Sequence, residues 1–137
     1  MRVFCSYAYT GENEATVHER MECVVAALKE SGHEVYCNLF DDGTIGFVDP
    51  DQFMHRALSI LPGYDTVLVI QASSRRSEGL LMEVGAALAL HKRIILAQHE
   101  SSIGHTYLPT LADETLIWRT GDELCDIARK LTVSRAV

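Results

Sequence analysis

The sequence has little positive charge and no long apolar run, and each shortage excludes a class of protein. Its 137 residues include 12 Lys and Arg against 19 Asp and Glu, which gives a net charge of -7. Such a surface would repel a nucleic acid or an anionic membrane. No apolar stretch is long enough for a membrane span or, near Met1, for a signal-peptide core. We therefore expect a cytoplasmic protein whose partner is a small molecule.

Patterns typical of metal sites and disulfide scaffolds are also missing. The six histidines form no HExxH or comparable ligand spacing, so we expect neither a metal ion nor another cofactor. The four cysteines are far apart and form no CxxC pair, which argues against a zinc site and a small disulfide scaffold. We expect all four to be reduced thiols: Cys5, Cys23, Cys37 and Cys125.

The composition that is present suits one globular domain. Hydrophobic residues make up 47% of the chain and charged residues 23%, which is enough for a core and a solvated surface. Along the chain, segments whose apolar residues have the period of a strand alternate with segments whose apolar residues have the period of a helix. This pattern predicts strands at 2–6, 33–39, 64–70, 93–97 and 115–118, and helices at 14–31, 50–61, 80–91 and 122–131.

Three of the predicted elements carry further signals. The second helix has Pro50 in its first turn and Asp49 as its N-cap. The third strand is almost entirely apolar after Asp65, as a central parallel strand covered on both faces should be. The loop after the second strand contains Gly43 and is expected to be mobile.

Strands that alternate with helices form a parallel sheet with right-handed crossovers. Five of them predict one doubly wound α/β domain over residues 1–137, with the flavodoxin-like strand order 2-1-3-4-5. In that order the chain reverses direction between the first and third strands. The loops that follow these strands, 6–11 and 72–79, should therefore form the ligand crevice.

The second of these loops opens a helix. Its free backbone N–H groups favour an anion, and Ser77 with Gly79 offers a hydroxyl and close backbone approach to a phosphate. The alternative is that Ser77 only caps the helix and Gly79 only makes a turn. Within the helix, Glu83 stands among apolar residues, where burial of a carboxylate is unfavourable and often marks a functional site. Its alternative is a solvent-facing position.

The stretch from Ser77 to Ile95 resembles the motif S/D-x-G-x-x-x-E-x-G-x-A-x-A-x-x-K-x-I of the nucleoside 2-deoxyribosyltransferase superfamily. Val3–Cys5, Asp51–His55 and Tyr64–Val69 resemble segments of its deoxynucleoside 5′-monophosphate N-glycosidase branch. The resemblance covers most of the chain. It implies the same α/β fold and a reaction at an N-glycosidic bond.

The resemblance also implies roles for two residues. In the family, a glutamate at the position of Glu83 attacks C1′ of the sugar and forms a glycosyl-enzyme ester. Six residues earlier, enzymes that act on free nucleosides tend to carry Asp, whereas the monophosphate hydrolases carry Ser. Ser77 therefore implies a nucleoside 5′-monophosphate, because a hydroxyl accommodates a phosphate that a carboxylate would repel. Both hydrolysis and transfer of the sugar fit the resemblance.

The chain departs from the family pattern at the second carboxylate, which helps to activate the leaving base. The matching positions lie near Ala57 and Leu58. Asp49, Asp51 and His55 are the candidates to replace it. The alternative for the two aspartates is a helix start, where acidic side chains favour the dipole, and the alternative for His55 is a surface or core-edge histidine. The general acid is therefore unassigned.

The first loop departs as well, since Tyr7 and Tyr9 stand where the monophosphate hydrolases carry small and basic residues. Tyr7 is expected to bond Glu83 or stack on a base, with a half-buried aromatic at a strand end as the alternative. Arg75 and Arg76 either supply the missing positive charge or are solvated.

The predicted site collects these residues. Glu83 and Tyr7 are the catalytic candidates, and no residue is assigned to a metal. Substrate binding is assigned to Cys5, Ser6, Tyr9, Asp51, His55, Ser77 and Gly79. Family members often complete the crevice with a neighbouring subunit, for which the segment 101–107 is the candidate, so we predict a homodimer.

Two other functions stay open. A TIR-like domain shares the strand order and uses a glutamate after a central strand to cleave NAD, and Val3–Tyr7 resembles its opening strand. The motif from Ser77 to Ala87 fits the deoxyribosyltransferase pattern better. The second is a nucleotide-binding module without catalysis, which the departures above permit.

Overall fold

Five parallel strands form one sheet in the order β2-β1-β3-β4-β5. The structure is a computed structural model that describes residues 1–132. The predicted doubly wound α/β fold and strand order are confirmed. The strands are β1 (Arg2–Tyr7), β2 (Glu34–Tyr36), β3 (Thr66–Gln71), β4 (Arg93–His99) and β5 (Glu114–Trp118).

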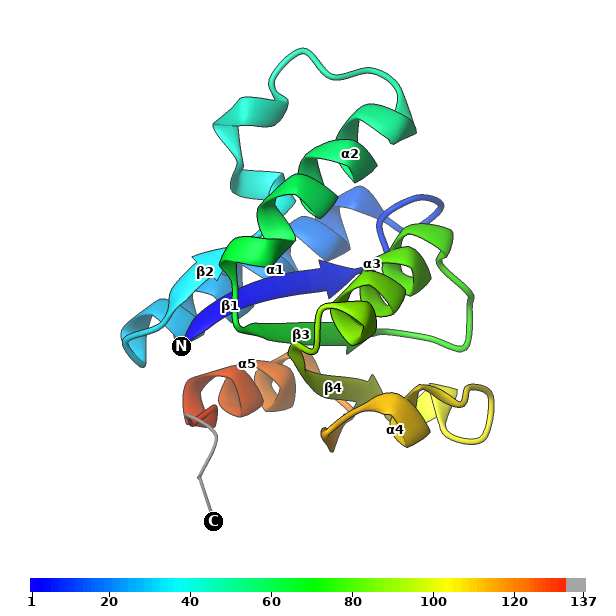
Figure 1. Ribbon diagram of the computed structural model, residues 1–137. Helices are drawn as coiled ribbons and strands as arrows, with labels where there is room; N and C mark the ends of the chain where they lie inside the picture. The colour runs from blue at the N-terminus through cyan, green and yellow to red at the C-terminus, as the bar shows by residue number, and fades with distance from the viewer. Residues whose placement is uncertain (133–137) are drawn as a thin grey trace.

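Helices cover both faces of this sheet (Figure 1). They are α1 (Glu14–Glu30), α2 (Pro50–Ile60), α3 (Glu78–Ala89), α4 (Leu108–Leu111) and α5 (Gly121–Lys130). One core lies between the sheet and α1 with α5, and the other lies between the sheet and α2, α3 and α4. The layered arrangement follows from strands that are apolar on both sides.

Alternate residues of each strand supply the two cores. On β1, Val3 and Cys5 face α1 and α5, whereas Phe4 faces α2 and α3. Every residue of β3 is buried, as predicted for the central strand. Removal of this apolar surface from water is the main favourable contribution to folding. The alternation also decides which side chains of a strand reach the same ligand.

The helices begin where the sequence signals a start. The Asn13 side chain caps α1 by accepting a hydrogen bond from the Thr16 N–H at 2.9 Å. At α2, Pro50 occupies the first turn, and the Gln52 side chain accepts a hydrogen bond from the Asp49 N–H at 2.9 Å. The four long helices agree with their predicted bounds within the one or two residues by which helix ends vary.

The segment after β2 differs from the prediction. β2 is shorter than expected, and the chain continues through two 3-10 turns, Asn38–Phe40 and Asp42–Thr44. The Asp41 carboxylate accepts hydrogen bonds from the Tyr36 hydroxyl at 2.7 Å and from the Arg56 guanidinium at 3.0 and 3.1 Å. The bond from Arg56 is the main reason that the pKa of Asp41 falls to about 2. The loop that was expected to be mobile is thus tied to α2 by a charged network.

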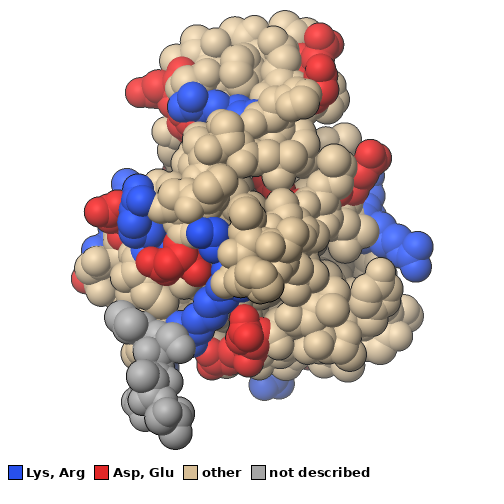
Figure 2. Space-filling model, in the orientation of Figure 1, with Lys and Arg blue, Asp and Glu red and all other residues tan. Residues whose placement is uncertain are grey.

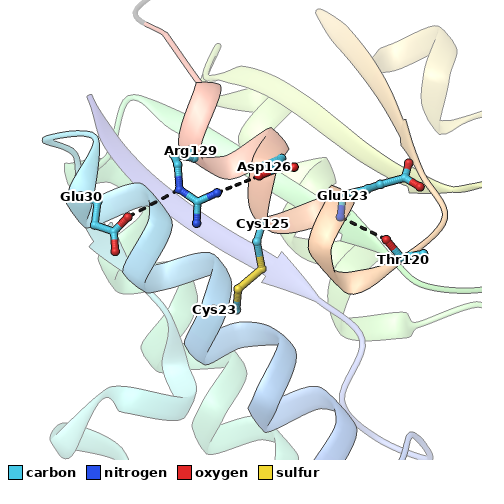
Figure 3. Close-up of a disulfide and its surroundings, with 7 residues drawn as sticks. All are labelled: Cys23, Glu30, Thr120, Glu123, Cys125, Asp126 and Arg129. Atoms are coloured by element: carbon cyan, nitrogen blue, oxygen red, sulfur yellow. Dashed lines mark hydrogen bonds and ion pairs between the residues drawn. A yellow bond between two sulfur atoms is a disulfide. The ribbon is translucent and has the colours of Figure 1, made fainter.

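A disulfide joins α1 to α5 (Figure 3). Cys23 and Cys125 are 102 positions apart in the sequence, but their Cα atoms lie 6.0 Å apart. The expectation that all four cysteines are reduced is therefore wrong for this pair, and the other two are free thiols. Spacing along the chain does not reveal which helices the fold brings together, and that contact decides the pairing. Near the bridge, Arg129 of α5 forms an ion pair with Glu30 of α1 at 3.6 Å.

One short helix was not predicted. α4 has only the four residues Leu108–Leu111. A single turn is too short to show helical periodicity in the sequence. Within residues 1–132, no helix has the length and apolar character that crossing a membrane requires.

Candidate active site

The carboxylate of Glu83 meets the end of β1. Glu83 lies on α3, and Ser6 lies on the β1 face that α3 covers. Ser6 is fully buried, and its hydroxyl donates a hydrogen bond to Glu83 Oε1 at 2.7 Å. This contact joins residues that are 77 positions apart at the crevice predicted from the strand order.

Burial changes the ionisation of Glu83. Desolvation raises the pKa of Glu83 from 4.5 to about 7, and the hydrogen bond from Ser6 partly opposes the rise. The solvent-facing alternative for Glu83 is therefore wrong, because its side chain lies largely within the protein. A carboxyl group with a pKa near neutrality exchanges protons at physiological pH and ionises to a nucleophile there.

Tyr7 and Cys5 point to the opposite side of the sheet from Ser6. Both belong to the core beneath α1, because alternate residues of β1 face opposite ways. The Tyr7 hydroxyl donates to Asn38 Oδ1. The Cys37 thiol donates to the Tyr7 hydroxyl oxygen at 3.7 Å. Burial raises the pKa of Tyr7 and that of Cys5. Glu83 thus receives its hydrogen bond from Ser6 and not from Tyr7.

A pocket of about 140 Å³ opens beside the start of α3. Its walls are the loop from Ala72 to Ser77, the first turn of α3 and the segment from His105 to Leu108, with Ala8 and Glu12 on the side of β1. Ser77 caps α3 by accepting a hydrogen bond from the Leu80 N–H at 3.3 Å. Ser77 and Glu83 are six residues apart, which corresponds to about 9 Å along a helix. A ligand that reaches from the carboxylate to the pocket must therefore be extended.

Comparisons with known proteins agree with the fold. No family model and no curated protein matches the chain. Among solved structures, the CMP N-glycosidase BcmB of Clostridium botulinum is 25% identical, with a TM-score of 0.64 over 92% of this chain and 95% of that one. The chain has the fold of the nucleoside 2-deoxyribosyltransferase-like superfamily. The predicted resemblance to this superfamily is confirmed.

Two further neighbours share the deoxyribosyltransferase-like fold. The solution structure of BlsM is 18% identical, with a TM-score of 0.69 over 93% of this chain and 88% of that one. A 2-deoxyribosyltransferase of Bacillus psychrosaccharolyticus is 14% identical, with a TM-score of 0.63 over 96% of this chain and 93% of that one. At these identities the likeness establishes the architecture on which the site is built.

The candidate site has no carboxylate at the α2 positions near Ala57 and Leu58, where the sequence comparison with the family expects one. Ala57 is buried in the core, and Asp51 and His55 are exposed on α2. Asp49 precedes the helix, with its backbone N–H bound by Gln52. Burial and the Ser6 bond account for the pKa shift of Glu83, with no contribution from a neighbouring charge in residues 1–132.

The remaining predicted residues occupy different places around the candidate site. Ser77 lines the pocket, whereas Gly79 lies where α3 approaches α2, since a Cβ there would be 3.4 Å from Met54 Cε. Tyr9 is exposed within the first loop. The Arg75 guanidinium packs on Gly11 of that loop, whose φ of +79° favours glycine. Arg75 thus joins the two loops of the crevice.

Two parts of the pocket lining were not predicted from the sequence. The segment 101–107, predicted to reach a neighbouring subunit, contributes His105 and Tyr107 to the chain's own pocket. Gln71, at the end of β3, also lines the pocket. Its signal was a polar residue at the carboxyl end of an otherwise apolar strand. Within the described residues, no group of three or more His, Cys, Asp or Glu side chains is placed to hold a metal ion.

Proposed function

We propose that this protein cleaves the N-glycosidic bond of a nucleoside 5′-monophosphate, with Glu83 as the nucleophile. The observation that carries the proposal is the largely buried Glu83 carboxyl, bonded to Ser6 at the edge where β1 and β3 end. Enclosed carboxyl groups with shifted pKa values are typical of catalytic positions. Neighbours with the same fold include an N-glycosidase and a 2-deoxyribosyltransferase.

The reaction proceeds in two displacements. The ionised Glu83 attacks C1′ of the sugar, a new C–O bond forms as the C–N bond breaks, and the base leaves with the bond's electron pair and takes up a proton. Water then attacks the same carbon and restores the carboxylate, giving a sugar 5-phosphate. Ser6 stabilises the carboxylate in the free enzyme and when it is released.

The pocket at the start of α3 is assigned to the phosphate of the substrate. The free N–H groups of the first turn and the Ser77 hydroxyl favour an anion there. Arg75 and Arg76 add positive charge at the wall of the pocket. This end of the site lies along α3 from Glu83, so one nucleotide spans both. CMP is the first substrate to test, because the 25% identical neighbour is a CMP N-glycosidase.

The proposal extends to the assembly and location of the protein. In Figure 2 the central part of the face shown carries few charged side chains. On α3, Leu81, Met82 and Leu88 are exposed apolar residues, which is typical of a surface that a partner covers. We propose a homodimer through this helix. We also propose a cytoplasmic location. The oxidation state of the Cys23–Cys125 pair in cells tests this location, because disulfides are rare in the cytoplasm.

The proposed activity is tested by following the release of free base by chromatography. The substrates are a panel of ribonucleoside and deoxynucleoside 5′-monophosphates, together with NAD, and Glu83→Ala is the control. Release of base from a monophosphate by the parent protein alone supports the proposal. Release of nicotinamide would favour a TIR-like activity instead. Saturable nucleotide binding without any release would identify a binding module and overturn the enzymatic assignment.

A further inference from the structure

Two glutamines lie side by side at the carboxyl edge of the sheet. Gln71 ends β3, and Gln98 is its register partner on β4. Both follow the core residues of their strands on the face covered by α3 and α4, because Val69 and Leu96 lie two positions earlier in that core. Gln71 is 9% exposed and Gln98 is 3% exposed.

These two side chains differ from the other buried polar residues. Ser6, His33 and Ser102 each form a side-chain hydrogen bond. Within residues 1–132, Gln71 Oε1 and Gln98 Nε2 are buried without any hydrogen-bond partner. A buried amide that lacks a partner is unfavourable, and a native protein that retains one commonly uses it for a ligand or water.

The position of Gln71 in the pocket lining indicates that its side-chain amide can contact a ligand. Its side chain lines the pocket at the start of α3, next to Ser73 and Ser77. We propose that Gln71 contacts the ligand in this pocket through its carboxamide N–H. In the structure Gln98 Nε2 and Gln71 Oε1 form no hydrogen bond with each other. We assign to Gln98 a positioning role that acts when the ligand binds: its Nε2 then donates to Gln71 Oε1, which directs the Gln71 N–H group toward the ligand. The free atoms are complementary, one donor and one acceptor, on adjacent strands.

The chemistry of the pocket selects a phosphate oxygen as the group that Gln71 meets. The pocket lining offers further donors: the free N–H groups of the first turn of α3, the Ser77 hydroxyl and the guanidinium groups of Arg75 and Arg76. Among residues 1–132, Glu12 is the one carboxylate of the pocket lining, and it lies within electrostatic range of Arg20. A neutral carboxamide among cationic and N–H donors suits an oxygen anion better than a base edge or an apolar group.

The assignment rests on the proposed function for the identity of the ligand, which is the phosphate of a nucleoside 5′-monophosphate. Its test is a binding experiment, so that it can fail separately from the catalytic proposal. Isothermal titration is carried out in a Glu83→Gln background, which prevents turnover. The probes are the tightest nucleoside 5′-monophosphate of the panel, the matching nucleoside and inorganic phosphate.

Gln71→Glu is the informative variant, since it keeps the shape of the side chain and adds a negative charge. We expect it to weaken binding of the monophosphate by at least about tenfold, because like charges at contact distance repel strongly near a protein surface. Binding of the nucleoside should be unchanged. Gln98→Leu should weaken monophosphate binding in the same direction but less. Gln52→Glu is the matched control, because Gln52 is exposed at the start of α2 and glutamate also suits that position.

Thermal unfolding of each variant separates local from global effects, and Gln71→Met replaces Gln71→Glu if the latter does not fold. If the Gln71 variant binds the monophosphate within about twofold of the parent affinity, the inference is overturned. Equal losses for nucleoside and monophosphate would also overturn it, as would the absence of phosphate and nucleotide binding by the parent. If base is released but Gln71→Glu has no effect, only the inference fails. If no base is released but phosphate binding depends on Gln71, only the proposed function fails.

Discussion

Replacement of Glu83 by glutamine is expected to stabilise the protein at alkaline pH while it abolishes activity. In the folded protein, burial raises the pKa of Glu83 from 4.5 to about 7. The unfolded chain releases this proton more readily, so ionisation of Glu83 favours unfolding. The resulting destabilisation is absent below the unfolded pKa of 4.5, grows between the two pKa values and is complete above about 7. The carboxamide of the Glu83→Gln variant carries no such charge and keeps an oxygen that can accept from Ser6.

The magnitude follows from the two pKa values. Each pKa unit corresponds to about 1.4 kcal/mol, so the shift destabilises the parent by roughly 3 kcal/mol at about pH 8 and roughly 1 kcal/mol at about pH 5. The gain in stability from Glu83→Gln should therefore be larger at the higher pH by about 2 kcal/mol. Contributions that do not depend on pH cancel in this difference.

Urea unfolding of the parent and the variant at both pH values measures the effect. The two proteins should show similar m-values, so that the midpoints report stability directly. Ser59→Ala, an exposed substitution on α2, serves as a control that should show no pH-dependent difference. An equal stability difference at the two pH values would refute the argument, because Glu83 would then ionise alike in the folded and unfolded chain.

Three other changes have defined outcomes. Ser6→Ala removes the hydrogen bond that opposes the upward shift in the pKa of Glu83, so this pKa should rise further. The acidic limb of the pH–rate profile should therefore move to higher pH, and an unmoved limb would contradict the role of Ser6. Cys23→Ser removes the disulfide between α1 and α5 and should lower the free energy of unfolding in urea by about 2–4 kcal/mol, with kcat retained. Unchanged stability under oxidising conditions would contradict the pairing. Arg56→Met removes the main cause of the low pKa of Asp41, whose stabilising effect is present above pH 3.8 and is lost as the pH falls toward about 2. The free energy of unfolding of the variant should therefore fall by about 1 kcal/mol at neutral pH and by little at acid pH. Equal losses at both pH values would refute this account.

The fold could be predicted because its signals are local. The apolar run of β3, the stripe of α1 and the Pro50 start of α2 each lie within a short window of sequence. Strand order then followed from general rules for parallel sheets. The end of β2 was predicted wrongly because the turns after it are held by hydrogen bonds between Asp41 and Arg56, which are 15 positions apart and form no local pattern.

The site was harder to predict than the fold. Glu83 and Ser77 carry a motif, and the strand order placed the crevice beside them. Tyr7 and Ser6 are adjacent in sequence, but alternation along β1 sends only Ser6 toward Glu83. Pairings between distant elements, such as the disulfide between α1 and α5, depend on packing that the sequence pattern does not encode.

The central claim is that Glu83 becomes covalently bonded to the sugar. Its most direct test is mass spectrometry of the protein after acid quenching during turnover of a nucleoside 5′-monophosphate, followed by mapping of the modified peptide. We predict a sugar phosphate ester on the peptide that contains Glu83, and no adduct in Glu83→Gln. An adduct on another residue, or base release that persists in Glu83→Gln, would contradict the account.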